Sequence, residues 1–321
     1  MRQGAGTGPV PEGPASAGTL MEQRIVNLVK REGPLTGSEI SEALGGDLLL
    51  LWRTCRLSTR LSLRTTCRRY LRLDRRIRGF ARLSPSILRE FLTYSVIGLK
   101  GDEKALARRI REIRLHIEDV TRVKSELAYT VFSSVVDRVG TRELIKDHAC
   151  IIIAGDIVHN MAHDVPRPER STGKLIKGSD MDVVVIVDDL FPEPEMKRLD
   201  QTIYREKQDI LMAPHLREEI DYIVKDMGRV REQARFATFR HMVACKILQE
   251  GTLLYGSEVL FSAIKDMLKR EGITEKLNDL EQRARRFRRG AEEHLLRDKP
   301  EKIGDEYQHL FYPSEESEEF E

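Results

Sequence analysis

Three short apolar runs in the second half of the chain constrain its fold most strongly. Residues Ala149–Ala154, 183–187 and 220–224 each have the length of a β-strand, and segments with helical patterns separate them. The run 183–187 consists of consecutive branched apolar residues, which is typical of a strand covered on both faces. This alternation predicts an α/β or α+β domain in which helices cover a sheet.

Two aspartates stand where the central apolar run begins. Asp180 and Asp182 are two residues apart, so on an extended chain both carboxylates point to one face, with their Cα atoms about 7 Å apart. Ionised acids held this close repel each other, and a divalent cation is the usual resolution. Asp221 interrupts the next apolar run and would complete a two-metal site if the two strands are neighbours. The alternative is that the first two acids cap a turn and that Asp221 forms an ion pair.

These residues carry a family resemblance. The segment Gly178-Ser179-Asp180-Met181-Asp182-Val183 resembles the Asp-x-Asp core of the DNA polymerase beta-like nucleotidyltransferase superfamily, and residues 251–256 are similar to a segment that follows the third carboxylate in many members. The resemblance covers about residues 149–261. It implies an α+β fold with a mixed sheet flanked by helices, an NTP substrate, and Mg²⁺ or Mn²⁺ held by Asp180, Asp182 and Asp221.

The chain departs from the family pattern after its first strand. That strand ends in Gly155-Asp156 where the family has Gly-Ser, whose serine and backbone amides hold the nucleotide phosphates. A carboxylate beside a triphosphate is unfavourable unless it points away. Other residues before the aspartate pair would then hold the nucleotide together with Gly155, and the candidates are Ser171, Thr172, Lys174, Lys177 and Ser179.

The N-terminal part of the chain has the pattern of a compact helical module. Turns at residues 33–34 (Gly-Pro) and 45–46 (Gly-Gly) separate three short helical patterns, the third over Leu48–Leu57. Residues 61–83 have the composition of wing strands. We therefore expect a winged helix-turn-helix domain over residues 21–99.

That module is strongly basic. Residues 53–82 hold eleven arginines and a single acid, Asp74. Arginine matches phosphate in a bidentate manner, so nucleic-acid contact is the functional interpretation. A solvated basic face, or docking on acidic parts of the same chain, is the alternative. The candidate contacts are Arg53, Arg56, Arg60, Arg64, Arg68 and Arg69, and Arg285, Arg286 and Arg288 form a second basic patch.

A long helix is expected between the two parts, within residues 100–140. Its apolar residues recur near coiled-coil spacing over Glu103–Val139, which would suit a homodimer. Lys124 occupies one position of that seam, so packing of the stripe on a neighbouring domain of the same chain is the alternative. The catalytic domain with C-terminal helices is then expected over residues 141–298.

The remaining features concern the two ends of the chain, the cellular location and a pair of histidines. Residues 1–20 are rich in Gly, Pro and Ala and are expected to be disordered, and residues 299–321 form an acidic tail. Four scattered cysteines without metal-ligand spacing, and no secretory or membrane-spanning run, predict a cytoplasmic protein. His159 and His163 have zinc-binding spacing on a helix, but a surface pair is the favoured interpretation because no glutamate stands between them.

Three functions are compatible with these patterns. The first is a metal-dependent transferase that moves an NMP from an NTP to an acceptor hydroxyl, with an RNA end as the favoured acceptor. The second is a DNA-binding transcriptional regulator whose nucleotidyltransferase domain only senses nucleotides. The third is synthesis of cyclic or oligomeric nucleotides without a macromolecular acceptor. Fold-level likeness does not choose between them.

Overall fold

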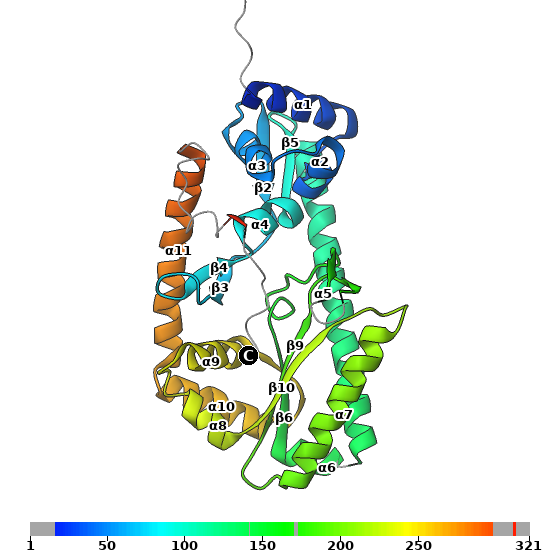
Figure 1. Cartoon of the computed structure of the whole chain (residues 1–321), viewed down its shortest axis with the longest axis vertical. Coiled ribbons are helices and arrows are strands. Elements are labelled where there is room, and N and C mark those ends of the chain that lie inside the picture. The colour runs from blue at the N-terminus through cyan, green and yellow to red at the C-terminus, as the bar shows by residue number, and fades with distance from the viewer. Residues whose placement is uncertain (1–16, 141, 170–172, 298–310, 313–321) are drawn as a thin grey trace, which may run out of the picture.

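The computed structural model describes residues 17–140, 142–169, 173–297 and 311–312. It is an α+β structure, as the sequence predicts (Figure 1). The N-terminal helices lie at one end of the molecule and the largest sheet lies at the other, while two long helices run along the sides. The predictions for residues 1–16, 170–172, 298–310 and 313–321 fall outside the described residues. The predicted disorder of residues 17–20 is wrong, because the first helix begins at Ala17.

The N-terminal end contains the three expected helices and a small antiparallel sheet. Its first five elements are α1 (Ala17–Glu32), β1 (Leu35–Thr36), α2 (Gly37–Leu44), α3 (Leu48–Leu57) and β2 (Leu61–Thr65). The sheet has the order β1-β5-β2, with β5 (Ser95–Leu99) in the middle. Thr36 and Glu39 form a reciprocal capping box at the start of α2, and Asp47 caps α3, so local sequence fixes both helix starts.

The segment between β2 and β5 contains β3 (Tyr70–Leu73), β4 (Ala81–Ser84) and α4 (Ile87–Tyr94). Helix α4 packs in the N-terminal core, whereas the β3-β4 hairpin leaves this module and joins the other end of the protein. The β3-β4 hairpin packs against α11 (Ile273–Arg297), and its apolar side chains share a core with the largest sheet. Conversely, Leu295 of α11 and Phe311 pack in the N-terminal core beside Trp52. The hydrophobic cores therefore do not follow the predicted domain boundary at residue 99.

The largest sheet has four strands in the order β10-β9-β6-β11. Strands β9 (Met181–Val187) and β10 (Ile220–Asp226) are parallel, while β6 (Ala149–Ala154) is antiparallel to β9, and β11 (Thr252–Gly256) is antiparallel to β6. The sheet is therefore mixed. All three predicted strands are present within these bounds.

Helices cover both faces of this sheet because its central strands are apolar on both sides. Val184 and Ile186 belong to the core formed with α9 (Phe239–Glu250), α10 (Glu258–Arg270) and α11, whereas Val183 and Val185 belong to the core formed with α5 (Glu103–Val139) and α7 (Glu193–Met212). The short helices α6 (Arg142–His148) and α8 (Met227–Gln233) complete the layers.

The long helix has the predicted bounds, and its apolar stripe packs within the chain. Helix α5 contacts α7 and β5. Lys124 is buried, donates a hydrogen bond to the carbonyl oxygen of Lys177 at 2.7 Å, and forms an ion pair with Glu218. The packing alternative is thus confirmed for the stripe. A homodimer through residues 103–139 stays a prediction.

Two features of the linker between β6 and β9 were not predicted. A small hairpin forms from β7 (Pro166–Pro168) and β8 (Leu175–Lys177). Residues 155–160 form turns, so the helix predicted for His159 and His163 is wrong.

In the part of the chain that is described, no helix has both the length and the apolar character required to cross a bilayer. Cys55, Cys67, Cys150 and Cys245 are free thiols that form no disulfide.

Candidate metal centre

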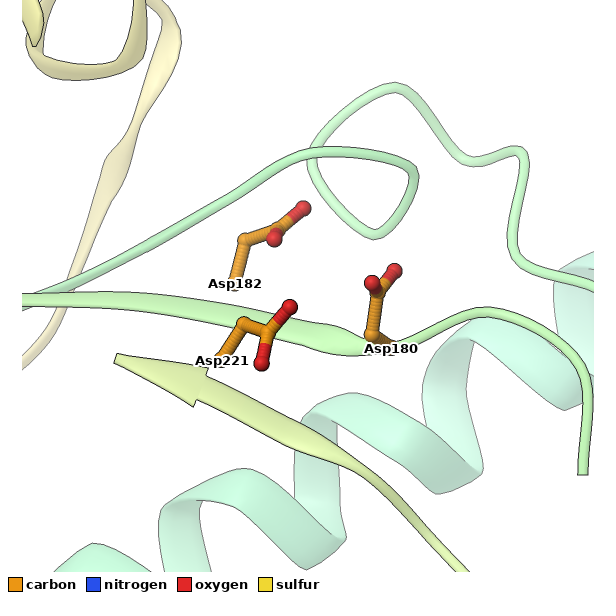
Figure 2. Close-up of side chains that lie close together, drawn as sticks. All are labelled: Asp180, Asp182 and Asp221. Carbon is orange, nitrogen blue, oxygen red and sulfur yellow. The ribbon is translucent and has the colours of Figure 1, made fainter. Parts of the chain in front are cut away.

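Three aspartate side chains converge at the end of the β9-β10 pair. Asp182 lies on β9 and its register partner on the parallel strand β10 is Asp221, while Asp180 directly precedes β9. One carboxylate oxygen of each aspartate lies within 4.8 Å of the others. Figure 2 shows Asp180 and Asp182 on the same side of the chain, with Asp221 beside them on the adjacent strand. The predicted neighbourhood of the three acids is therefore confirmed.

Two glycines allow close packing of the chain around these acids. Gly155 ends β6 with a φ of +69°, and a Cβ atom at this position would lie 1.8 Å from Oδ2 of Asp182. Gly178 precedes the aspartate pair with a φ of +61°, and a Cβ atom there would lie 1.8 Å from the carbonyl oxygen of His163. Both positions combine a left-handed backbone with a close approach, which only glycine accepts.

Two basic side chains accompany the acids. Arg167 of β7 lies 3.3 Å from a carboxylate oxygen of Asp180 and 2.8 Å from one of Glu219, and its Nε donates to the carbonyl oxygen of Gly178 at 2.7 Å. Lys207 of α7 donates to Asp221 at 3.0 Å. Arg167, Lys207 and Glu219 were not among the predicted site residues. The sequence offered no signal for Arg167 or Lys207, because tertiary packing alone brings them to the acids.

The acids strongly influence one another. Burial raises the pKa of Asp180, and the nearby Asp221 raises it further, while Arg167 acts in the opposite direction. Burial also raises the pKa of Glu219 to about 6, with Asp221 as the next cause. A cluster of carboxylates that raise one another's pKa gains free energy when a divalent cation enters it.

Asp156, the residue that breaks the family pattern, points into the protein. Its carboxylate accepts hydrogen bonds from Tyr70 at 2.5 Å, Arg89 at 2.7 Å and Ser179 at 2.8 Å. Burial alone would raise its pKa, but Arg89, His163 and these hydrogen bonds outweigh that effect and hold the pKa well below the usual range. The charge that would disfavour a triphosphate is thus compensated within the protein.

The predicted nucleotide-binding residues have different positions. Gly155 borders the acids, whereas the Ser179 hydroxyl is buried and donates to Asp156. Lys177 is exposed and its Nζ donates to the carbonyl oxygen of His215 at 3.1 Å, while the exposed Lys174 contacts the sulfur of Met212. Ser179 is therefore a structural residue rather than a free phosphate ligand, and Ser171 and Thr172 lie outside the described residues.

The arginine group divides into engaged and exposed members. Arg53 donates to the carbonyl oxygen of Leu295, and Arg69 forms ion pairs with Glu90 at 2.6 Å and Glu292 at 2.9 Å. Both link the module to α11, so for these two arginines the alternative of docking within the same chain applies. The exposed members are Arg56, Arg60, Arg64 and Arg68.

The second basic patch divides in the same way. Arg288 is buried and pairs with Glu90 at 3.2 Å, while the exposed Arg285 pairs with Glu281 one helical turn away. Arg286 is exposed. Because α11 packs against the β3-β4 hairpin, part of its basic face serves the interior of the chain.

The histidines do not form a metal site within the described residues, where the aspartate trio is the one cluster with suitable geometry. His159 pairs with Glu250 at 2.9 Å, and its ring stacks on Tyr70 with the centroids 3.8 Å apart. Glu250 also pairs with the buried Lys246 at 2.8 Å. His159 therefore has a packing role, and it is half-buried rather than the surface residue we expected.

Known proteins add nothing to this description. No family model matches the chain, and comparison with curated proteins and with solved structures finds no match. The chemistry of the site therefore has to be argued from its own residues. Three converging carboxylates, two nearby basic side chains and a glycine-lined approach suit a divalent cation and a phosphate-bearing ligand.

Proposed function

We propose that this protein is a metal-dependent nucleotidyltransferase that moves an NMP group from an NTP to an acceptor hydroxyl. The observation that carries the proposal is the convergence of Asp180, Asp182 and Asp221, whose ligand oxygens lie within 4.8 Å of one another. The register of two parallel strands produces this convergence, and only the third acid had to come from a separate part of the chain. The arrangement agrees with the expectation from the Asp-x-Asp resemblance.

The donor set fits a hard divalent cation. All three candidate ligands are carboxylates, which favour Mg²⁺ or Mn²⁺ over zinc. All three are half-buried, so they remain accessible from one side. When bound, such ions would polarise the phosphoryl oxygens and make the acceptor hydroxyl more acidic.

Arg167 and Lys207 supply the positive charge that a triphosphate needs. Each pairs with a candidate metal ligand, Arg167 with Asp180 and Lys207 with Asp221. A cation that enters the site would replace their role as counter-charges, because the carboxylates would then bind the ion. We infer that both side chains turn to the phosphate oxygens, where charge-assisted hydrogen bonds are strong.

The transfer reaction itself is an in-line displacement. The acceptor oxygen forms a bond to the α-phosphorus while the bond to the bridging oxygen of the β-phosphate breaks. Pyrophosphate leaves with that electron pair, and the hydroxyl proton passes to water. The protein's own contribution is to hold the two reactants in line and to stabilise the charge that develops on the phosphoryl oxygens.

A nucleic acid, with an RNA end favoured, is the proposed acceptor. The order helix, strand, helix, helix, strand in the N-terminal module, with β5 closing its sheet, supports a winged helix-turn-helix interpretation. Arg56 on α3 and Arg64 on β2 are exposed on this module. Exposed arginines attract phosphate without sequence preference, which suits an enzyme that acts on chain ends.

The test is a label-transfer assay. The protein is incubated with α-³²P-labelled NTPs, Mg²⁺ and separate pools of RNA, DNA and protein, and one reaction contains no added acceptor. Asp182→Asn should abolish transfer. Asp226→Asn, at the far end of strand β10, should not, because Asp226 caps α8 and asparagine caps helices equally well. Transfer that survives Asp182→Asn, or no transfer to any pool, would overturn the proposal.

A DNA-binding regulator is the second candidate, and the exposed arginines of the N-terminal module support it. In that case the protein binds duplex DNA and its affinity changes when an NTP and Mg²⁺ are added, but no label is transferred. A gel-shift titration with and without nucleotide, run beside the transfer assay, distinguishes the two functions. A labelled product in the reaction without acceptor would instead indicate synthesis of a cyclic or oligomeric nucleotide.

A further inference from the structure

We propose that Asp156, held by Tyr70 and Arg89, is a positioning residue that sets the geometry of the metal centre. The inference rests on the metal centre proposed above. It assigns a role to the one residue that departs from the family pattern, and to a segment that the sequence attributed to the N-terminal module. Neither Tyr70 nor Arg89 contacts a reacting group, so both would act through Asp156.

Side chains from another part of the chain hold the turn that follows β6. Residues 155–163 run from the end of this strand to His163, which hydrogen-bonds to Ser179 beside the aspartate pair. Three side chains of the segment between β2 and β5 hold these residues in place. Tyr70 and Arg89 donate to the Asp156 carboxylate at 2.5 Å and 2.7 Å, and the buried Tyr94 donates to the carbonyl oxygen of Met161 at 2.6 Å. The Tyr70 ring also stacks on His159.

Hydrogen bonds also join this turn to Ser179, the residue before Asp180. Ser179 donates its hydroxyl proton to Asp156 at 2.8 Å, and its backbone N–H donates to the carbonyl oxygen of His163 at 2.9 Å. The N–H of His163 donates back to the Ser179 hydroxyl at 3.2 Å. Ser179 directly precedes Asp180, so these bonds fix the backbone from which the Asp180 carboxylate extends.

The same turn lies against Asp182. Gly155 neighbours Asp156 in the chain and lies so close to Asp182 that a Cβ atom on it would overlap the carboxylate. Any rotation of the Asp156 peptide therefore shifts Gly155, which lies against the Asp182 carboxylate. One buried carboxylate thus controls the surroundings of two of the three candidate metal ligands.

The origin of the donors gives this network its functional meaning. Tyr70 lies on β3 and Arg89 on α4. In the sequence, both elements stand between strands β2 and β5 of the N-terminal module, which carries the exposed arginines. Arg68, an exposed candidate for nucleic-acid contact, stands two residues before Tyr70. The N-terminal segment therefore supplies two of the donors that hold Asp156 beside the metal centre.

The experiment measures Mn²⁺ affinity of the full-length protein by electron paramagnetic resonance, together with the melting temperature. Asp156→Asn should weaken Mn²⁺ binding by about 10-fold or more, the usual effect of losing a group that orients metal ligands. Tyr70→Phe, which removes one donor and leaves the charge pair intact, should weaken binding by roughly threefold. The Tyr70→Phe variant keeps the test valid if Asp156→Asn does not fold.

The matched control is Asp74→Asn. Asp74 accepts from the buried Arg82 at 3.0 Å within the same inserted segment, and it is not part of the Asp156 network. This variant should lower the melting temperature and leave Mn²⁺ affinity within twofold of wild type. Equal weakening by Asp74→Asn would assign the effect to general destabilisation and overturn the inference.

The outcomes also separate the inference from the proposed function. Mn²⁺ binding that is lost in Asp182→Asn and unchanged in folded Asp156→Asn and Tyr70→Phe overturns the positioning role alone. A wild-type protein that binds no Mn²⁺ overturns both. Loss of affinity in the Asp156 and Tyr70 variants, with a normal Asp74 control, supports the role of the network.

Discussion

Replacing Gly155 by alanine should disable the proposed metal centre while leaving most of the protein folded. The added Cβ atom would lie 1.8 Å from Oδ2 of Asp182, whereas a carbon and an oxygen need about 3.3 Å, so one of them must move by roughly 1.5 Å. The backbone cost is separate. A non-glycine residue at a φ of +69° costs about 1–2 kcal/mol.

The consequence for metal binding follows from the required movement. A displacement of about 1 Å at a reacting group can reduce function by roughly 100-fold. We therefore expect Mn²⁺ affinity to fall by between about 10-fold and 100-fold in Gly155→Ala. Titration with Mn²⁺ monitored by electron paramagnetic resonance gives the affinity, and denaturant unfolding gives the stability.

Gly140→Ala is the matched control for this prediction. Gly140 caps the end of α5 with a φ of +73°, and nothing lies within 4 Å of the Cβ position. It should show the same backbone cost without any change in metal affinity. The reasoning is refuted if folded Gly155→Ala binds Mn²⁺ as wild type does, or if Gly140→Ala loses affinity to the same extent.

Three further predictions follow from buried or exposed charges. Lys124→Met should destabilise the protein by about 3–5 kcal/mol in urea unfolding, because it leaves the Glu218 carboxylate without its ion-pair partner. Burial lowers the pKa of Lys225 from 10.5 to about 8, so Lys225→Met should stabilise the fold by up to about 3 kcal/mol at pH 7. That gain should shrink as pH rises from 8 towards 10.5, since the native ammonium loses its proton first; a gain independent of pH would contradict the assignment. Arg56→Ala combined with Arg64→Ala should lower the salt dependence of nucleic-acid binding by about two in the log–log slope without changing Mn²⁺ affinity.

Predictions from local sequence patterns succeeded where the interactions that determine a structure lie within one contiguous segment. The apolar runs of β6 and β9, the turns that separate the N-terminal helices and the bounds of α5 could all be predicted, because each depends on neighbours within a few residues. The aspartate pair belongs to the same class, since two residues of extended chain already place Asp180 and Asp182 on one face.

Predictions failed where a side chain finds its partner far away in the sequence. Arg69 has the composition of a nucleic-acid contact, yet it pairs with Glu292 on α11 at 2.9 Å. Ser179 has the position of a phosphate ligand, yet it donates to Asp156. Charge and hydrogen-bonding capacity are visible in the sequence, but the choice between water, ligand and protein partner is made by burial.

The sequence by itself therefore determined three strands of the largest sheet, the long helix and the acids of the candidate metal centre. Only the tertiary structure decided that Asp221 stands beside Asp182, that Arg167 and Lys207 compensate the acids, and that Tyr70 and Arg89 reach Asp156 from another part of the chain. The physical reason is the range of the forces involved. Backbone geometry and capping act between near neighbours, whereas ion pairing and desolvation act between whichever groups the packed cores bring together.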